Sequence, residues 1–392
     1  MKEDWKECII GDICDSISET YSRNDNEVVL INTSDVLEGK FLPNKTTKNE
    51  NLKGQFKKTF KKNDILYSEI RPANKRYAFV DFDKTENYIA STKLMVIRPY
   101  TDKVIPKYLY ALLTSNFLIN KMQLLAETRS GTFPQITFSG ELATYSIKLP
   151  PLGTQQKIAQ ILSSLDDKIE LNNKINDNLE QQAQAIFKSW FVDFEPFGGK
   201  MPEGWRMGKL SEIADIIMGQ SPDGKSYNED DIGTVFYQGR AEFGTRFPTR
   251  RLFTTEPKRI AKKFDTLMSV RAPVGDLNIA NEDCCIGRGL AAIHSKDSHQ
   301  SFIHYTVVFL HPQLDVFNGE GTVFGCINRD ALNNMEVLIP SKSDLDKFEQ
   351  IVAALDNDIF NRTEENQNLV FLRDTLLPKL MSGEIDVNSG QV

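Results

Sequence analysis

Apolar residues recur in alternating steps of four and three along two long stretches of the chain, the spacing of one face of an α-helix. The first stretch covers 150–190 and begins at a double proline. Its regular positions are Ile158, Leu162, Leu165, Ile169, Asn172, Asn176, Leu179, Ala183, Ile186 and Trp190. The second stretch has the corresponding positions Phe348, Val352, Leu355, Ile359, Arg362, Asn366, Leu369, Arg373, Leu376 and Leu380. Each predicted helix is roughly 50–60 Å long at a rise of 1.5 Å per residue.

The two predicted helices share their heptad spacing and a polar centre, so we expect them to pack against each other. Asn176 and Asn366 occupy equivalent positions, and a polar residue in an apolar helix interface lowers stability but fixes register and partner. The alternative is that each helix only covers its own domain. Ser343 with Asp346 predicts a capping box at the start of the second helix. Pro378 predicts a kink or an end.

The chain contains an internal repeat, which is the first thing to seek in a sequence of this length. Two tryptophans open similar segments, WKECIIGDICDSI from Trp5 and WRMGKLSEIADII from Trp205. Asp64 and Asp265 open DILYSEIRP and DTLMSVRAP. The longest match aligns 131–169 with 321–359 without gaps and shares ten of 39 positions. The order of the matches is the same in both halves, so we interpret the chain as a duplication.

Each half begins with a globular part that has a mixed α/β pattern. Short apolar runs predict strands over 27–31, 64–68, 76–80, 94–98 and 146–149 in the first half, and over 235–238, 265–270, 289–294 and 335–339 in the second. Helices are expected over 107–125 and 302–310. The predicted fold class is α+β, with two mixed α/β domains, each followed by a long helix, and the helices paired as an antiparallel coiled coil. The domain boundaries are placed at 1–150, 151–195, 196–340 and 341–392.

The composition predicts a cellular location and shows that charge is unevenly distributed along the chain. No window contains eighteen uninterrupted apolar residues, so no membrane span is predicted. The first residues lack the order of a signal peptide, and the five cysteines form no CxxC pair, which together favour a cytoplasmic protein with free thiols. The net charge is −7, but 40–76 holds eleven Lys and Arg against three acids, and 239–271 holds nine against three. Such local patches, rather than the net charge, govern attraction to a phosphate backbone. The simpler alternative is two solvated lysine-rich faces.

Motifs for catalysis and for metal binding are missing. The sequence has no GxGxxG, GxxxxGK[ST], HExxH or GxSxG, and its four histidines lack the spacing of a zinc site. Asp64 and Glu69 resemble a nuclease carboxylate pair, but the repeat has Val270 near that place and no acid–x–Lys follows. An acid at a strand end is the preferred interpretation. We predict no catalytic residue, no metal and no cofactor.

The remaining candidates are polar loops suited to binding. A basic loop after a strand can place guanidinium groups on phosphates or on guanine, and Gln or Asn can contact adenine. For any single side chain, ordinary surface polarity is the alternative. The predicted DNA-binding set is Arg71, Lys75, Arg76, Arg129, Ser130, Thr132 and Gln135 in the first half, with Arg240, Arg246, Arg271, Arg288, Thr322 and Asn328 in the second.

Several segments resemble those of one family, the specificity subunits of type I restriction–modification systems. They are PPLGTQQKIAQILSSLDDKIE from Pro150, FKSWFVDFEPF from Phe187, DILYSEIRPANKRYAFV from Asp64 and TLLPKLMSGEI from Thr375. The resemblance extends over essentially the whole chain. The chain departs from the family pattern at Thr154-Gln155, where Glu-Gln is usual, and the second copy lacks the second proline.

The resemblance implies a non-catalytic subunit that binds double-stranded DNA through two target-recognition domains, each specific for one half of a bipartite, asymmetric site. It also implies that the helices space these domains and dock two methyltransferase subunits, which carry the S-adenosylmethionine site and methylate adenine N6. Restriction subunits that use ATP to translocate DNA would complete the complex. The residues expected in helix pairing and partner docking are Leu162, Leu165, Ile169, Asn176, Leu179, Trp190, Val352, Leu355, Ile359, Asn366 and Leu369. The alternatives are a self-sufficient nuclease or methyltransferase and a coiled-coil scaffold without DNA binding.

Overall fold

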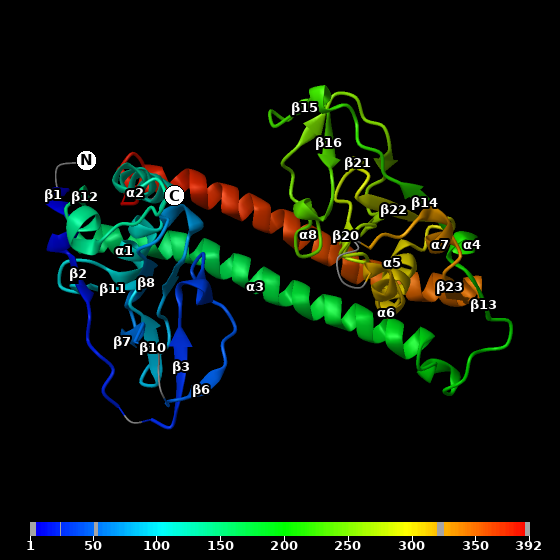
Figure 1. The fold of residues 1–392 in the computed structure, drawn as a ribbon, viewed down its shortest axis with the longest axis horizontal. Helices are drawn as coiled ribbons and strands as arrows, with labels where there is room; N and C mark the ends of the chain where they lie inside the picture. Colours follow the sequence, from blue (N-terminus) through cyan, green and yellow to red (C-terminus); the bar gives the residue numbers. More distant parts are fainter. Residues whose placement is uncertain (1–4, 24, 51–53, 320–324, 389–392) are drawn as a thin grey trace. The chain divides into compact units, whose positions relative to one another are not determined.

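The chain forms two compact units in the computed structural model, which describes residues 5–23, 25–50, 54–319 and 325–388 (Figure 1). The first unit contains 1–170 and 366–392, and the second contains 171–365. Each unit therefore includes a globular part together with one portion of each of the two longest helices, α3 (Leu152–Phe191) and α8 (Lys342–Met381).

The first unit is built on two four-stranded sheets. An antiparallel sheet has the order β2-β11-β8-β9, with strands Cys14–Ile17, Leu94–Pro99, Ile65–Ser68 and Tyr77–Phe79. A second sheet has the order β6-β3-β10-β7, with strands Thr46–Lys48, Glu27–Ile31, Tyr88–Ser91 and Phe56–Lys58, and its β3–β10 pair is parallel. Two short ladders add β1 (Lys6–Ile9) with β12 (Ser146–Leu149), and β4 (Val36–Leu37) with β5 (Lys40–Phe41).

The second unit repeats this plan. Its antiparallel sheet β14-β22-β19-β20 consists of Ala214–Met218, Leu290–Ser295, Thr266–Ser269 and Leu277–Ile279. A five-stranded sheet β15-β17-β16-β21-β18 consists of Tyr227–Asn228, Phe253–Thr254, Thr234–Tyr237, Cys284–Ile286 and Ile260–Ala261, and its β16–β21 pair is parallel. The ladder of β13 (Arg206–Lys209) with β23 (Glu336–Ile339) corresponds to β1–β12. The repeat predicted from sequence is thus confirmed in the topology.

The shorter helices correct one prediction. A single helix was expected over 107–125, but the structure has α1 (Pro106–Leu113) and α2 (Asn116–Arg129). The break comes at Ser115, whose side-chain oxygen accepts the backbone N–H of Leu118 at 3.2 Å and so caps α2. The second unit has α5 (Gln300–Phe309), where a helix was expected, and the short α4 (Leu210–Ile213), α6 (His311–Leu314) and α7 (Arg329–Asn333).

The ends of α8 correct two further predictions. The helix begins at Lys342 and not after Ser343, because Ser341 is the capping residue: its hydroxyl accepts the Asp344 N–H at 3.2 Å. Pro378 does not end the helix, which continues to Met381. A proline removes only one backbone hydrogen bond, and this proline lies in the last turn of the helix.

Within each unit, α3 contributes to the hydrophobic core beside α8. In the first unit, Ile158 and Leu162 of α3 are buried in the same cluster as Leu380 of α8. In the second unit, Phe187 of α3 and Phe348 of α8 are buried together, with ring centroids 5.9 Å apart. The two helices are therefore part of each unit's fold.

Polar side chains also join α3 to α8. In the first unit, Asp166 forms an ion pair with Arg373 at 2.9 Å. In the second unit, Asn172 donates to Glu365 at 2.8 Å and Asn176 donates to Thr363 at 3.3 Å. Asn172 is fully buried, whereas the predicted Asn176 is half-buried.

Candidate nucleic-acid interface

The structure brings two of the predicted loops of the first unit side by side. The loop after β8 contains Arg71, and the loop after α2 contains 129–135. Two backbone hydrogen bonds join them, from Arg71 N–H to the carbonyl of Pro134 at 3.0 Å and from Ile136 N–H to the carbonyl of Glu69 at 2.9 Å. Predicted DNA-binding residues that are more than fifty positions apart in the sequence therefore lie on one surface.

The loop after β8 has an unusual backbone. Arg71 has φ of 43° and Lys75 has φ of 52°, on either side of the short 3₁₀-helix Pro72–Asn74. Non-glycine residues in this left-handed region cost about 1–3 kcal/mol and persist where the surrounding structure holds them, often at functional sites. Here the Ala73 N–H is bound by the Gln123 side chain of α2 at 3.0 Å.

The three basic residues of this loop differ in exposure and in the groups that they bind. Arg71 is exposed. Lys75 forms an ion pair with Glu38 at 3.3 Å, with 39% of its side chain exposed. Arg76 is half-buried and donates to the carbonyls of Ser34 and Val36, so its guanidinium holds neighbouring backbone.

The neighbouring loop is held by Glu141, a residue that sequence reasoning missed. Its carboxylate accepts the backbone N–H of Thr137 at 2.7 Å and a side-chain N–H of Arg129 at 2.6 Å. Burial raises the pKa of Glu141, but the hydrogen bonds from Thr137 and the nearby Arg129 guanidinium outweigh burial and leave the pKa lowered. Ser130 accepts the N–H of Phe133, which is a half-exposed ring. Thr132 is exposed and Gln135 half-buried.

The second unit joins the equivalent loops with the same pair of backbone bonds. Ala272 N–H binds the carbonyl of Gly325 at 3.0 Å, and Ile327 N–H binds the carbonyl of Val270 at 3.1 Å. Asn328 uses its side-chain oxygen to cap α7, accepting the Ala331 N–H at 2.8 Å. The predicted Thr322 lies outside the described residues.

Three of the predicted arginines lie around this second pair of loops. Arg271 is exposed within the first loop. Arg288 is exposed and next to Gly289, whose carbonyl accepts the N–H of Val270 at 2.9 Å. Arg240 forms an ion pair at 2.6 Å with Asp276, which follows the same loop. Arg246 lies elsewhere: its side chain is only 11% exposed and is bound by Glu180 and Asp356 of the long helices.

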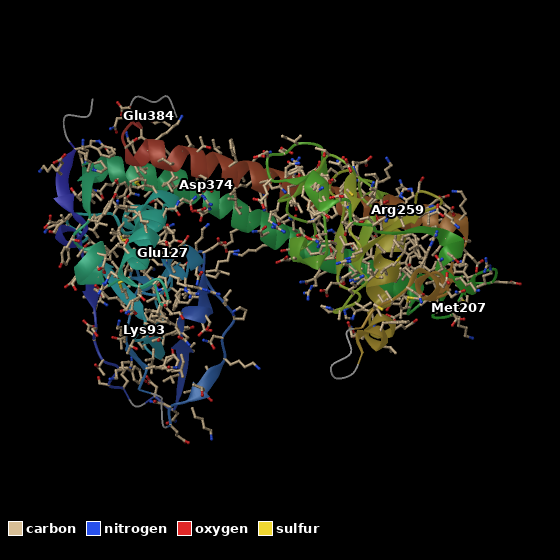
Figure 2. All side chains as sticks on the ribbon, turned by 45° about the horizontal axis from the view of Figure 1, so that its top comes forward. Lys93, Glu127, Met207, Arg259, Asp374 and Glu384 are labelled. Atoms are coloured by element: carbon tan, nitrogen blue, oxygen red, sulfur yellow. The ribbon has the colours of Figure 1, made fainter. Side chains whose placement is uncertain are left out.

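The two basic segments differ in how many of their cations are paired with carboxylates. In 239–271, five cations are in ion pairs: Arg240, Arg246, Arg250, Arg251 and Lys262. Arg259, labelled in Figure 2, is among the exposed cations left. In 40–76, five exposed lysines have no carboxylate within ion-pair distance among the described residues: Lys40, Lys45, Lys48, Lys57 and Lys61. The first unit thus has the larger uncompensated positive charge.

Asp64, which the sequence analysis considered as a possible nuclease residue, is buried in an ion pair with Arg98. It is 1% exposed, and both its oxygens are bound at 2.8 Å by Nε and Nη2 of Arg98. The repeat places Asp265 and His294 in the same positions, with Nδ1 2.5 Å from the carboxylate. Burial raises the pKa of Asp265. Among the described residues, no group of three or more His, Cys, Asp or Glu is arranged to hold a metal ion.

The positions predicted for helix pairing and docking are all buried or half-buried. Four of them are buried: Leu162, Val352, Ile359 and Asn366. The other seven are half-buried: Leu165, Ile169, Asn176, Leu179, Trp190, Leu355 and Leu369. Large apolar side chains that are exposed on the long helices were not in the predicted set, and they include Leu171, Ile351, Phe371 and Leu372. Phe371 is 73% exposed.

Comparison with known proteins identifies the family. The model of the type I restriction modification DNA specificity domain matches the chain twice, at 2–181 and 202–369. The chain belongs to the family of type I restriction–modification specificity subunits. The specificity subunit of the type I restriction enzyme HindI from Haemophilus influenzae is 34% identical, over 97% of this chain and 100% of its own length.

A further relative agrees with this assignment, and a solved structure has the same fold. A putative type I restriction enzyme MjaX specificity subunit from Methanocaldococcus jannaschii is 32% identical over 83% of this chain and 79% of its own. The crystal structure of the S subunit of a type I restriction–modification system from M. genitalium has the same fold, with a TM-score of 0.59 at 17% identity over 96% of both chains. Membership of this family implies a non-catalytic role. None of the helices in the described part of this specificity subunit is long and apolar enough to cross a membrane.

Proposed function

We propose that this specificity subunit recognises DNA through two domains, 1–150 and 196–340, each contacting one half of a bipartite asymmetric site. The observation that carries the proposal is the duplicated loop pair, joined by the same two backbone bonds around Arg71 in one unit and Arg271 in the other. Exposed guanidinium groups at such loops suit phosphates and guanine edges. Because the two loop pairs differ in sequence, they suit two different half-sites.

The long helices, 151–195 and 341–392 with their flanking residues, act as the spacer between the two domains. We infer that α3 and α8 pair as an antiparallel coiled coil. Support comes from the order of their contacts within the second unit, where residues of increasing number in α3 meet residues of decreasing number in α8. Each helix has 40 residues, roughly 60 Å at 1.5 Å per residue.

Two methyltransferase subunits are the proposed partners of these helices, with restriction/translocase subunits joining for cleavage. The exposed Phe371 and Leu372 on α8 support a docking surface, because adjacent large apolar side chains in water are typical of protein–protein contacts. Adenine methylation and DNA cleavage are assigned to the partners. This chain then requires no cofactor of its own.

Methylation mapping tests the proposal. Cells that express this chain with its methyltransferase partner should methylate adenines in one bipartite motif. Exchange of 1–150 for the corresponding domain of another specificity subunit should change one half of that motif and leave the other half intact. A change in both halves, or in neither, would contradict the assignment of one half-site to each domain.

Two alternatives make opposite predictions for the purified chain. A self-sufficient enzyme would cut or methylate DNA with magnesium or S-adenosylmethionine alone, whereas we expect neither reaction. A scaffold without DNA binding would show no salt-dependent affinity, whereas the affinity of the specificity subunit should fall steeply as salt rises. Replacing Leu165 and Leu355 with Asp should separate the helices or release the partner, which size-exclusion chromatography would detect.

A further inference from the structure

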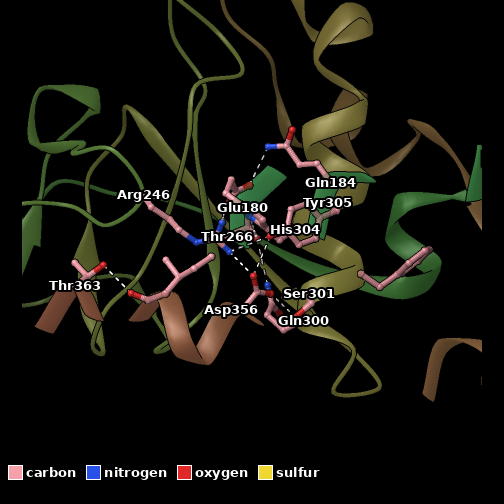
Figure 3. Close-up of polar contacts among 12 residues, drawn as sticks. Glu180, Gln184, Arg246, Thr266, Gln300, Ser301, His304, Tyr305, Asp356 and Thr363 are labelled. Carbon is pink, nitrogen blue, oxygen red and sulfur yellow. Dashed lines mark hydrogen bonds and ion pairs between the residues drawn. The ribbon is translucent and has the colours of Figure 1, made fainter. Parts of the chain in front are cut away.

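Arg246 was predicted to contact DNA, but the structure places it between the recognition domain and both long helices (Figure 3). Its guanidinium pairs with Glu180 of α3 through one terminal nitrogen and with Asp356 of α8 through the other. Its side chain is 11% exposed, and those of Glu180 and Asp356 are 26% and 19% exposed. A single residue of the globular part is thereby bound to two helices at once.

The partners of Arg246 are themselves held in place. Asp356 accepts hydrogen bonds from the hydroxyl of Ser301 at 2.6 Å and from the hydroxyl of Tyr305 at 2.9 Å. The guanidinium of Arg246 also lies over the Tyr305 ring, 5.9 Å from its centroid. Figure 3 shows these side chains converging from α3, α5, α8 and the segment that carries Arg246. Such a network fixes orientation, because each charged hydrogen bond requires a particular geometry.

The backbone of Arg246 is also hydrogen-bonded to the sheet. The carbonyl of Arg246 accepts the N–H of Ile279, the last residue of β20, at 2.9 Å. The next residue, Phe247, is buried against Ile279 and Ile359, and its ring lies 5.6 Å from that of Phe360. The sheet, the Arg246–Phe247 segment and the two helices are thus connected by direct contacts.

In the first half of the chain, the aspartate equivalent to Asp356 has a different kind of partner. The internal repeat aligns Asp166 with Asp356. Asp166 receives its cation from Arg373, which belongs to α8 and not to a globular domain. The aspartate that joins helix to helix in the first unit therefore joins a domain to a helix in the second.

We propose that Arg246 is a positioning residue that sets the orientation of the second recognition domain on the helices, and thereby the spacing at which its half-site is accepted. The inference rests on the proposed function. It assigns Arg246 no base contact, because its terminal nitrogens are bound to Glu180 and Asp356. Loss of Arg246 should therefore relax the required distance between half-sites and leave the bases of both half-sites unchanged.

The test uses the complex of the full chain with its methyltransferase partner. Methylation mapping first gives the two half-sites and the number n of base pairs between them. Initial methylation rates are then measured on duplexes with spacers of n−1, n and n+1. We expect Arg246→Met to reduce the preference for n over n±1 by about tenfold, as expected for the loss of charged hydrogen bonds. Arg250→Met is the matched control, because Arg250 is in the same segment but its ion pairs among the described residues are with the surface residues Asp231 and Glu282.

Each outcome decides the proposal. An unchanged spacing preference in Arg246→Met overturns it, and a change in the bases of the second half-site would make Arg246 a base-contacting residue instead. If Arg246→Met does not fold, judged by thermal unfolding, Asp356→Asn removes the charge from the same contact with little change in shape. A folded Asp356→Asn with the wild-type preference also overturns the proposal. If the wild-type complex methylates no bipartite site, the proposed function itself fails before any variant is compared.

Discussion

Replacing Arg98 with Met should destabilise the first unit strongly, because it leaves the buried carboxylate of Asp64 without its cation. Asp64 is 1% exposed, while the Arg98 side chain is 19% exposed. Two charged hydrogen bonds at 2.8 Å would be lost, and of the hydrogen bonds to this carboxylate within the described residues the Lys61 N–H, also at 2.8 Å, would remain. The substituted methionine is of similar length, so little packing is lost.

The expected cost is about 3 kcal/mol, the lower end of the range for breaking a buried ion pair, because Arg98 keeps some access to water. Hydrogen exchange of the β8 and β11 amides measures this cost within the first unit without requiring the whole chain to unfold in two states. A loss of about 3 kcal/mol corresponds to roughly hundredfold faster exchange through global opening.

Two controls make the result specific. Lys62→Met removes a surface pair with Asp83 and should cost less than about 1 kcal/mol. The double substitution Asp64→Asn with Arg98→Met should recover part of the loss, because the unpaired buried charge is gone. Exchange rates in Arg98→Met within threefold of wild type, or a double variant less stable than Arg98→Met, would refute the structural role assigned to Asp64.

Three further predictions address the partner, the DNA and the thiols. Phe371→Asp should weaken methyltransferase binding by about tenfold or more, given the 1.5–3 kcal/mol of a buried phenylalanine; unchanged association in titration calorimetry would exclude this docking surface. Arg71→Ala and Arg271→Ala should each cost about 1–3 kcal/mol of DNA affinity, and an effect on the opposite half-site would contradict the domain assignment. Burial raises the pKa of the Cys14 thiol to about 12, so the native state should lose stability as the pH rises from 9 towards 12. Alkylation at pH 8 should modify the exposed Cys326 well before Cys14, as mass spectrometry can show.

The sequence was sufficient for those features that repeat at a regular period. Short apolar runs predicted β3 and β12 with their exact bounds, and the heptad spacing predicted the helices α3 and α8 but not the ends of α8. These features depend on local patterns, which one sequence contains in full. The internal repeat also predicted that the two units contain equivalent sheets, because equivalent segments occur in the same order in both halves.

Features that depend on single polar contacts were not predictable. The apolar pattern of 107–125 is continuous, yet the Ser115 cap divides it into two helices. Ser341 and Ser343 both precede a run with an acid three residues later, and only the structure distinguishes the capping residue. The same limit applies to the candidate site, since the partners of Arg246 lie 66 residues before it in α3 and 110 residues after it in α8.

The unequal charge of the two units has a consequence for the order of events when the protein meets DNA. Among the described residues, the exposed side chains of Lys45, Lys48, Lys57 and Lys61 form no ion pair, whereas most arginines of 239–271 are already neutralised by acids. Long-range attraction acts first on uncompensated charge. We therefore expect the first domain to capture the duplex and to slide along it through phosphate contacts. The second domain would then accept or reject each passing sequence, so that search and verification are divided between the two halves of a duplicated chain.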